Sequence, residues 1–334
     1  MNYREEYKNW CTDAYFDEDT KAELKALEGN EAEIEDRFYK KLEFGTGGLR
    51  GVIGAGTNRM NIYTVRQATE GLSRLIESYG EEAKKRGVAI AYDSRHFSPE
   101  FAMESARTLA THGIKSYVFE SLRPTPELSF AVRHLHTFAG IMITASHNPA
   151  AYNGYKVYGE DGGQMPPKDA DALTAYVRQV ANPLEIEVLD DEALEASGLV
   201  TIIGKDVDDA YLKEIKTVSV NPKLLSDVEG LSVVYTPLHG TGLMLVEKAL
   251  EQANFKGLHV VEEQAVPDGD FSTVKSPNPE EAGAFEYAVE LGKKVGADVL
   301  LATDPDADRL GAAVRLPDGS YQVITGNQIA AILV

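Results

Sequence analysis

Cysteine is nearly absent from this chain, which has only Cys11 in 334 residues. A single cysteine excludes an internal disulfide and therefore the class of small secreted domains that depend on such bonds. The sequence also lacks any run of about 18 apolar residues that could span a membrane, and its first residues contain no apolar signal core. These absences predict a protein of the reducing cytoplasm.

Basic residues are scarce relative to acidic ones. Lysine and arginine together number 33, against 53 aspartates and glutamates, which gives a formal net charge of −20. This balance disfavours nucleic acid and anionic membrane surfaces as partners. Hydrophobic residues make up 43% of the chain, which is enough to build buried cores, and the length predicts two or three domains.

A serine and a histidine stand side by side after a short apolar run. The run Phe138–Ile143 predicts a buried strand, and Asn148–Pro149 prevents its continuation. Ser146 and His147 are thereby placed at the carboxyl end of a strand, where open α/β sheets bind ligands. Taken alone, the motif is also compatible with a plain turn in which the serine bonds nearby backbone.

Three aspartates at alternate positions follow a second strand-like run, Val299–Thr303. Asp304, Asp306 and Asp308 can converge on a hard cation such as Mg²⁺ only if the chain leaves the strand, and the proline after the first of them favours such a turn. An EF-hand is disfavoured because arginines stand where that loop needs glycine and glutamate. An aspartyl phosphatase and a solvated acidic turn are the alternatives, although the phosphatase leaves the serine loop without a role.

A glycine-rich loop, Phe44–Gly51, precedes both motifs. Its glycines would let backbone N–H groups approach an anion, and Arg50 adds a bidentate donor suited to phosphate. The loop is neither a Walker loop nor a dinucleotide-binding motif, and a flexible turn is the alternative. Lys156 follows the serine loop closely enough to reach it as a proton shuttle or a counter-charge, although a single lysine is more often a surface charge.

The remaining pattern predicts alternating helices and strands. After a helical start that ends near Lys41, Val88–Tyr92 is predicted as a strand, and Ser98 and Pro99 as the N-cap and first residue of the next helix. The acidic, weakly patterned stretch Leu184–Val200 is interpreted as a linker between domains.

The same order of elements recurs at an offset of 143 residues, where Tyr92 corresponds to Tyr235 and His96 to His239. We expect both histidines to be structural. The repeat predicts two similar three-layer α/β/α domains with mainly parallel sheets. The expected domains are residues 1–200 with the serine loop, residues 201–322 with the acidic loop, and residues 323–334 as the start of a third.

The four motifs occur in the same order as in the α-D-phosphohexomutase superfamily, and the chain from about Phe38 to Asn327 resembles the first two domains of that family. The sequence of Leu42–Gly51 and of Asn58–Asn61 is most similar to the corresponding segments of the phosphoglucomutase and phosphopentomutase branch. The resemblance implies reversible transfer of phosphate between the two ends of a hexose or pentose. Transfer in this family passes through a phosphorylated serine and a bisphosphosugar intermediate.

The resemblance also implies a role for each matching residue, one bound Mg²⁺ ion, a small phosphosugar as substrate and a hexose 1,6-bisphosphate as activator. Phosphoserine carries about −1.5 to −2 charges, so a cation and basic donors are needed beside three carboxylates. The catalytic residues of the family match Ser146, His147, Lys156 and Arg50; its phosphate-binding residues match Thr46, Gly47, Gly48, Arg50 and Arg309; and its metal ligands match Ser146, Asp304, Asp306 and Asp308.

The sequence departs from the family near its end. The sugar-recognition motif of the family's third domain and the phosphate loop of its fourth are absent, and the chain stops at Val334 in an apolar stretch without a helix-ending residue. We therefore expect a truncated chain that cannot complete the mutase cycle alone. Glucose is the favoured sugar; a phosphomannomutase, a phosphopentomutase and a non-catalytic phosphosugar- or metal-binding module are the alternatives.

Overall fold

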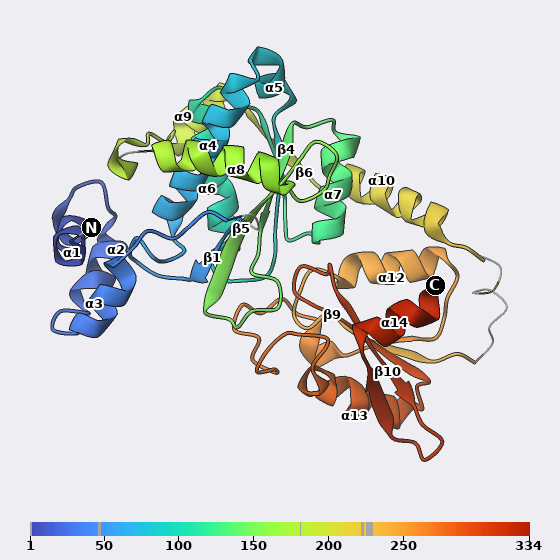
Figure 1. Ribbon diagram of the computed structural model, residues 1–334. Helices are drawn as coiled ribbons and strands as arrows, with labels where there is room; N and C mark the ends of the chain where they lie inside the picture. Colours follow the sequence, from blue (N-terminus) through green and yellow to red (C-terminus); the bar gives the residue numbers. More distant parts are fainter. Residues whose placement is uncertain (1, 46–47, 181, 222–223, 225–229) are drawn as a thin grey trace.

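The chain folds into two α/β domains that lie side by side (Figure 1). The first is coloured blue to yellow and the second orange to red, and helix α10 (Lys205–Ile215) packs against a helix of each domain. The expected α/β class with two three-layer domains is confirmed. The computed structural model describes residues 2–45, 48–180, 182–221, 224 and 230–334.

The first sheet has six strands in the order β1-β5-β4-β2-β3-β6. The pairs β4–β2, β2–β3 and β3–β6 are parallel, whereas β5 runs antiparallel to both β1 and β4. The carboxyl ends of β2 and β4 therefore lie next to each other at one edge of the sheet. The strands are β1 (Leu49–Val52), β2 (Val88–Tyr92), β3 (Ser116–Phe119), β4 (Ala139–Ile143), β5 (Tyr152–Tyr158) and β6 (Val200–Ile203).

Helices cover both faces of this sheet. Val88 and Ile90 of β2 join a core with α4, α6 and α8, whereas Ala89 and Ala91 join a second core with α7 and α10. This alternation explains why the central strands are apolar at every position. Besides α10, the α-helices of this domain are α1 (Tyr3–Thr12), α2 (Glu18–Lys25), α3 (Glu31–Phe38), α4 (Ile62–Ser78), α5 (Glu81–Arg86), α6 (Ser98–Thr111), α7 (Thr125–His134), α8 (Pro167–Gln179) and α9 (Asp191–Ser197).

The stretch that we interpreted as a linker belongs instead to the first domain. Arg107 on α6 donates to the backbone oxygen of Leu189 at 3.1 Å and forms an ion pair with Asp191 on α9. Strand β6, which follows, pairs with β3 and extends the first sheet to Ile203, beyond the boundary expected at residue 200. The linker prediction was wrong because this segment is fixed by polar contacts and edge pairing, which leave little apolar periodicity.

Helix α6 begins one residue earlier than predicted. Ser98 is its first residue and does not cap it, and Phe97 before it has a left-handed backbone with φ of 63°. The Ser98 hydroxyl donates to Asp93 Oδ1 at 2.9 Å, so it is not available to the helix. The cap prediction was therefore wrong, because the Ser98 hydroxyl bonds the buried Asp93 carboxylate and not a backbone N–H of the first helical turn.

The second domain repeats the plan on a smaller scale. Its sheet has the order β11-β10-β9-β7-β8; the pairs β9–β7 and β7–β8 are parallel, and β10 is antiparallel to its two neighbours. Figure 1 shows α12 and α13 on opposite sides of this sheet. The elements are β7 (Val233–Thr236), α12 (Leu243–Gln252), β8 (Leu258–Val260), α13 (Glu286–Val295), β9 (Val299–Thr303), β10 (Leu310–Arg315) and β11 (Tyr321–Ile324).

The internal repeat is visible in the structure. Tyr92 lies in β2 and Tyr235 in β7, and each strand is followed by a helix and a parallel partner strand. His239, at the repeated loop position, is buried and bonds through both ring nitrogens, to Val266 O at 2.9 Å and to Thr273 Oγ1 at 2.8 Å. These contacts give it the structural role that we expected.

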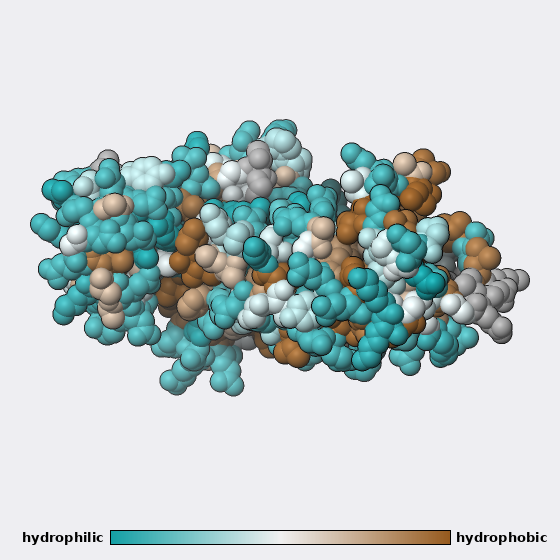
Figure 2. Space-filling model, turned by 90° about the horizontal axis from the view of Figure 1, so that it is seen from below, coloured by the Kyte–Doolittle hydropathy of each residue, from teal (hydrophilic) through white to brown (hydrophobic). Residues whose placement is uncertain are grey.

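Helix α14 (Gly326–Leu333) ends the chain and has no buried residue. Ile332 and Leu333 are 72% and 78% exposed. Seen from below, the surface is mostly hydrophilic, with smaller apolar patches along its whole length (Figure 2). Within the described ranges, no helix combines the length and the apolar character that a membrane span requires.

A buried carboxyl on α7 makes the stability of this fold depend on pH. Glu127 is fully buried, and burial followed by the nearby Asp208 carboxylate raises its pKa to about 9. Arg123 does not cancel this effect, because its guanidinium is bound by Asp208 at 2.8 and 3.0 Å. The unfolded chain releases this proton near the ordinary pKa of glutamate, whereas the folded chain keeps it. The contribution of Glu127 to the free energy of unfolding therefore falls as pH rises between these two values.

We expect Glu127→Gln to remove this pH dependence, since its amide has nearly the size of the protonated carboxyl and does not titrate. Relative to the wild type, the variant should gain at least about 1 kcal/mol between about pH 5 and pH 8. Urea unfolding at several pH values measures the difference, with exposed Glu120→Gln as the control. A stability difference that stays constant over this range would contradict the prediction.

Candidate active site between the two domains

The loop after β4 presents Ser146 in a strained conformation. Ser146 has φ of 54°, a left-handed backbone that is uncommon for a residue other than glycine. Its N–H donates to Thr144 Oγ1 at 2.8 Å, and the residue is only 3% exposed. The loop therefore fixes a buried hydroxyl at the carboxyl end of the sheet.

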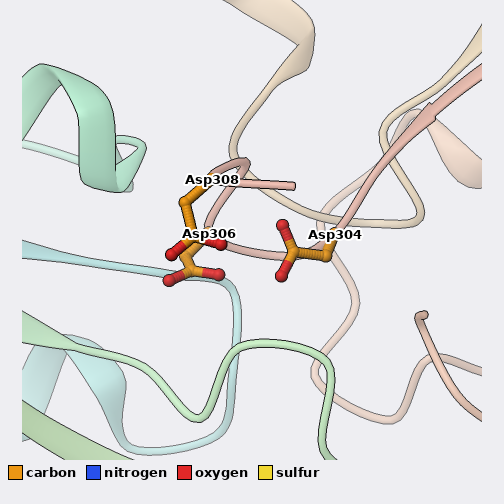
Figure 3. A group of neighbouring side chains, drawn as sticks. All are labelled: Asp304, Asp306 and Asp308. Carbon is orange, nitrogen blue, oxygen red and sulfur yellow. The ribbon is translucent and has the colours of Figure 1, made fainter. Parts of the chain in front are cut away.

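The acidic loop after β9 turns sharply, and its three carboxylates converge. Ala307 has φ of 51°, which takes the chain out of strand geometry between Asp306 and Asp308. Figure 3 shows Asp304 pointing toward the other two side chains, and one ligand oxygen from each lies within 4.8 Å of the others. Asp304 and Asp306 are fully buried, whereas Asp308 is exposed. The turn thus achieves the convergence that alternate spacing along a strand could not.

The two loops meet although they are 158 residues apart in the sequence. Ser146 Oγ donates to Asp304 Oδ2 at 2.9 Å, and His147 Nδ1 lies 3.2 Å from the same hydroxyl. Burial, followed by the positive charges of Arg309 and Arg50, lowers the pKa of His147. The hydroxyl therefore stands between a carboxyl of one domain and a neutral imidazole of the other.

Lys156 reaches the same centre from β5, where it is paired with Met142 of β4. Its Nζ donates to Asp306 Oδ2 at 2.9 Å and lies 3.7 Å from Asp308 Oδ2. Thr125, at the start of α7, donates its hydroxyl to the same Asp306 oxygen at 2.9 Å. Thr125 was not found from the sequence, because nothing in its local pattern distinguishes it from an ordinary helix start.

The close approach of the three carboxylates and Lys156 shifts the pKa values of Asp304 and Asp306 in opposite directions. Burial and the charges of Asp306 and Asp308 raise the pKa of Asp304 above its usual range. Burial alone would raise the pKa of Asp306 as well, but the Lys156 ammonium outweighs it and lowers that pKa. Burial would lower the pKa of Lys156, and the same carboxylate keeps it raised. The charge of Asp306 is therefore balanced by Lys156, whereas Asp304 binds a proton more tightly than an ordinary aspartate does.

The donor set fits a hard cation. Asp306 Oδ1 is buried and has no hydrogen-bond partner among the described residues, a costly state for a carboxylate oxygen unless a ligand uses it. Three carboxylates with oxygens this close are the ligands that Mg²⁺ and similar ions prefer. The acidic triad could thus hold a metal ion beside the Ser146 hydroxyl.

The remaining candidates lie around this centre. Arg50 is exposed and donates to Asn148 Oδ1 at 3.1 Å, and the N–H of Arg309, also exposed, donates to Asp304 Oδ1 at 3.1 Å. Gly48 has φ of 93°, and a Cβ there would lie 2.0 Å from a backbone oxygen of β5, so only glycine fits. The other two candidates from the glycine loop, Thr46 and Gly47, lie outside the described residues.

Comparison with known proteins places this geometry in a family. Models of the phosphoglucomutase/phosphomannomutase family match residues 41–183, as α/β/α domain I, and residues 209–317, as α/β/α domain II. A phosphoglucomutase of Staphylococcus aureus strain USA300 is 44% identical over 313 residues, which are 93% of this chain and 55% of that protein. The chain therefore spans about half the length of this relative.

Solved structures give the same picture. A crystal structure of a presumed phosphomannomutase from Thermus thermophilus is similar with a TM-score of 0.69 and 28% identity. The match covers 84% of this chain and 58% of the other. A phosphoglucomutase/phosphomannomutase family protein from Burkholderia thailandensis, at 22% identity and a TM-score of 0.64, shares the fold over 85% of this chain and 56% of its own.

Proposed function

The chain belongs to the phosphoglucomutase/phosphomannomutase family, and from this premise we propose that it carries the nucleophile and the metal loop of a phosphosugar mutase. The proposed reaction interconverts the 1-phosphate and 6-phosphate of a hexose, with glucose favoured because the relative that is 44% identical is named a phosphoglucomutase. The partner is then a small phosphosugar, and the enzyme works in the cytoplasm.

One observation carries the proposal: the buried Ser146 hydroxyl stands 2.9 Å from Asp304 in a triad of carboxylates. Strained backbone conformations are often found at functional sites. A strained, buried serine that contacts an acidic loop of another domain therefore favours a functional site over a plain turn. We assign Ser146 as the phosphate carrier, and Asp304, Asp306 and Asp308 with the Ser146 oxygen as the ligands of one Mg²⁺. When bound, the ion would offset negative charge on the phosphoryl oxygens.

The side chains around Ser146 suit phosphoryl transfer in both directions. In the forward step the Oγ–P bond of phosphoserine breaks while a sugar oxygen forms the new O–P bond. The proton of the sugar hydroxyl is passed on by the surrounding side chains, and the departing serine oxygen ends protonated, so that one proton moves in net from sugar to serine. Lys156 is charged, because its pKa is raised by the Asp306 carboxylate against the effect of burial. We assign it to offset charge on the departing serine oxygen, or to protonate that oxygen as its negative charge develops. Arg50 is the candidate to take part in proton transfer at the sugar, and neutral His147 orients the serine.

The phosphate of the substrate needs local donors, because the net charge of −20 opposes an anion. We assign this function to Arg50, Arg309 and the glycine loop, and we propose that a hexose 1,6-bisphosphate activates the enzyme by phosphorylating the serine. The phosphate-binding residues proposed from this loop are Thr46, Gly47 and Gly48.

Phosphorylation of the chain by glucose 1,6-bisphosphate with Mg²⁺ tests the function. We expect mass spectrometry to find one phosphate, on Ser146, and glucose monophosphate in solution. Ser146→Ala should remove the label, whereas Ser320→Ala, at an exposed turn, should keep it. Phosphate on Asp304 would instead establish an aspartyl phosphatase, and no label in the wild type would refute the proposed carrier.

A further inference from the structure

Arg95 is a buried arginine whose guanidinium donates its hydrogen bonds to the backbone of the serine loop. Its Nη2 donates to Ser146 O and Asn148 O, both at 2.6 Å, and its Nη1 donates to Pro149 O at 2.9 Å and Tyr152 O at 3.0 Å. Its side chain is 0% exposed. One planar group therefore ties together four carbonyl oxygens between residues 146 and 152.

The arginine is itself held by a buried acid. Asp93, which follows β2, accepts the backbone N–H of Arg95 and the Ser98 hydroxyl, each at 2.9 Å, and its Oδ2 lies 3.3 Å from Arg95 Nε. Asn153 in turn donates to Ser98 Oγ at 2.9 Å. A buried guanidinium is costly without an opposite charge, and Asp93 supplies that charge. Its carboxylate is also hydrogen-bonded to the Thr144 side chain at the start of the serine loop.

The second domain covers this arrangement. The ring of Phe271 lies with its centroid 4.9 Å from Arg95 Cζ, and it is almost fully buried. His96 Nε2 bonds Asp270 Oδ1 across the domain boundary at 2.7 Å. The guanidinium is therefore placed between the serine loop and the segment of the second domain that packs on it.

The loop needs such a support because its own bonds are few. Within the loop, the N–H of Ser146 bonds Thr144 Oγ1, that of Asn148 bonds Ala145 O, and that of Tyr152 bonds Pro149 O. Each of these bonds joins residues only two or three positions apart. The left-handed backbone at Ser146 costs about 1 kcal/mol or more and persists only where surrounding contacts determine it. A displacement of about 1 Å at a reacting atom can slow a reaction about 100-fold.

We propose that Arg95 is a positioning residue, which holds Ser146 in its left-handed conformation and its Oγ at the acidic loop. The inference rests on the proposed function of Ser146 as the phosphate carrier. Among the described residues, the hydrogen bonds of the Arg95 guanidinium go to backbone oxygens and not to the Ser146 hydroxyl or the triad, although its charge acts on Asp304 and Asp306 at longer range. Arg95→Lys keeps that charge and so separates it from the positioning role. The four carbonyl oxygens are shared between two nitrogens, two acceptors for Nη1 and two for Nη2. The planar, two-nitrogen shape of the guanidinium is therefore needed as well as its positive charge.

Arg95→Lys and Arg95→Met test this role in single-turnover phosphorylation of Ser146 by glucose 1,6-bisphosphate. We expect both rates to fall at least about 100-fold, with Mg²⁺ affinity within about threefold of the wild type. Lysine should not rescue the rate, because one ammonium cannot span all of these carbonyl oxygens. Arg59→Lys is the matched control: Arg59 is also buried but pairs with Glu33 and Asp36, far along the chain from the loop.

Hydrogen exchange provides a readout that does not depend on phosphorylation. Amides between residues 145 and 153 should exchange faster in both Arg95 variants and unchanged in Arg59→Lys. If the substitutions at Arg95 prevent folding, Phe271→Leu removes only the covering ring and should slow phosphorylation about tenfold. A wild-type-like rate and unchanged exchange in a folded Arg95 variant would overturn the inference. A wild-type chain that is never phosphorylated would refute the proposed function instead, and loop exchange would then decide the role of Arg95.

Discussion

Replacing Asp306 with asparagine is expected to weaken Mg²⁺ binding at least about 100-fold. Loss of a residue that only supports a metal ligand commonly costs about 10- to 100-fold in affinity, and Asp306 is proposed as a ligand itself. Its Oδ1 is the buried oxygen without a partner among the described residues, and its Oδ2 already accepts from Lys156 and Thr125. An amide oxygen in this place would keep the shape and lose the charge.

Titration calorimetry with Mg²⁺, and Mn²⁺ titration followed by electron paramagnetic resonance, measure this loss. Asp318→Asn is the control, since Asp318 is an exposed carboxylate in the turn between β10 and β11. Affinity of the wild type should also rise with pH, because the raised pKa of Asp304 makes a proton compete with the cation. Equal binding by the wild type and Asp306→Asn would remove the proposed metal site.

The parts of the site that lie in one segment could be predicted from the sequence. The strand Val299–Thr303 and the strand Val88–Tyr92 were predicted with the boundaries that the structure shows, because buried parallel strands are short, apolar and ended by polar turn residues. Convergence of the three aspartates also followed from local reasoning. The carboxylates need a turn to meet, and a proline stands at the right place for one.

Contacts between distant segments could not be predicted from the residues alone. Nothing local brings Ser146 to Asp304. The internal repeat, in which each copy leads to a strand that bears one of the two loops, and the order of the motifs in the family suggested that they meet. Arg95 was missed because it binds backbone carbonyl oxygens, which every sequence has and no pattern marks. Asp191 was assigned to a linker for a related reason: an ion pair and an edge strand leave no periodic signal.

The second large effect is expected from Lys156→Met, which should slow phosphorylation of Ser146 at least about 100-fold, the usual range for loss of a proton-transfer group. The Lys156 side chain is only 9% exposed, and its ammonium is bound to Asp306 Oδ2. Because the position is buried, a cation from the solvent could not take the place of the ammonium in the variant. Methionine keeps the length and packing of the side chain without the charge.

The same substitution should leave Mg²⁺ binding intact or strengthen it. Lys156 occupies an oxygen of Asp306 and lies 3.7 Å from Asp308, so its removal frees negative charge for the cation. Metal affinity and transfer rate should therefore move apart in Lys156→Met and fall together in Asp306→Asn. Lys156→Arg, with its charge kept but its geometry changed, should recover only part of the rate. Single-turnover kinetics and Mn²⁺ titration on the same samples measure both quantities. If Lys156→Met lost metal binding in proportion to its rate, Lys156 would have to be assigned to the metal site and not to phosphoryl transfer.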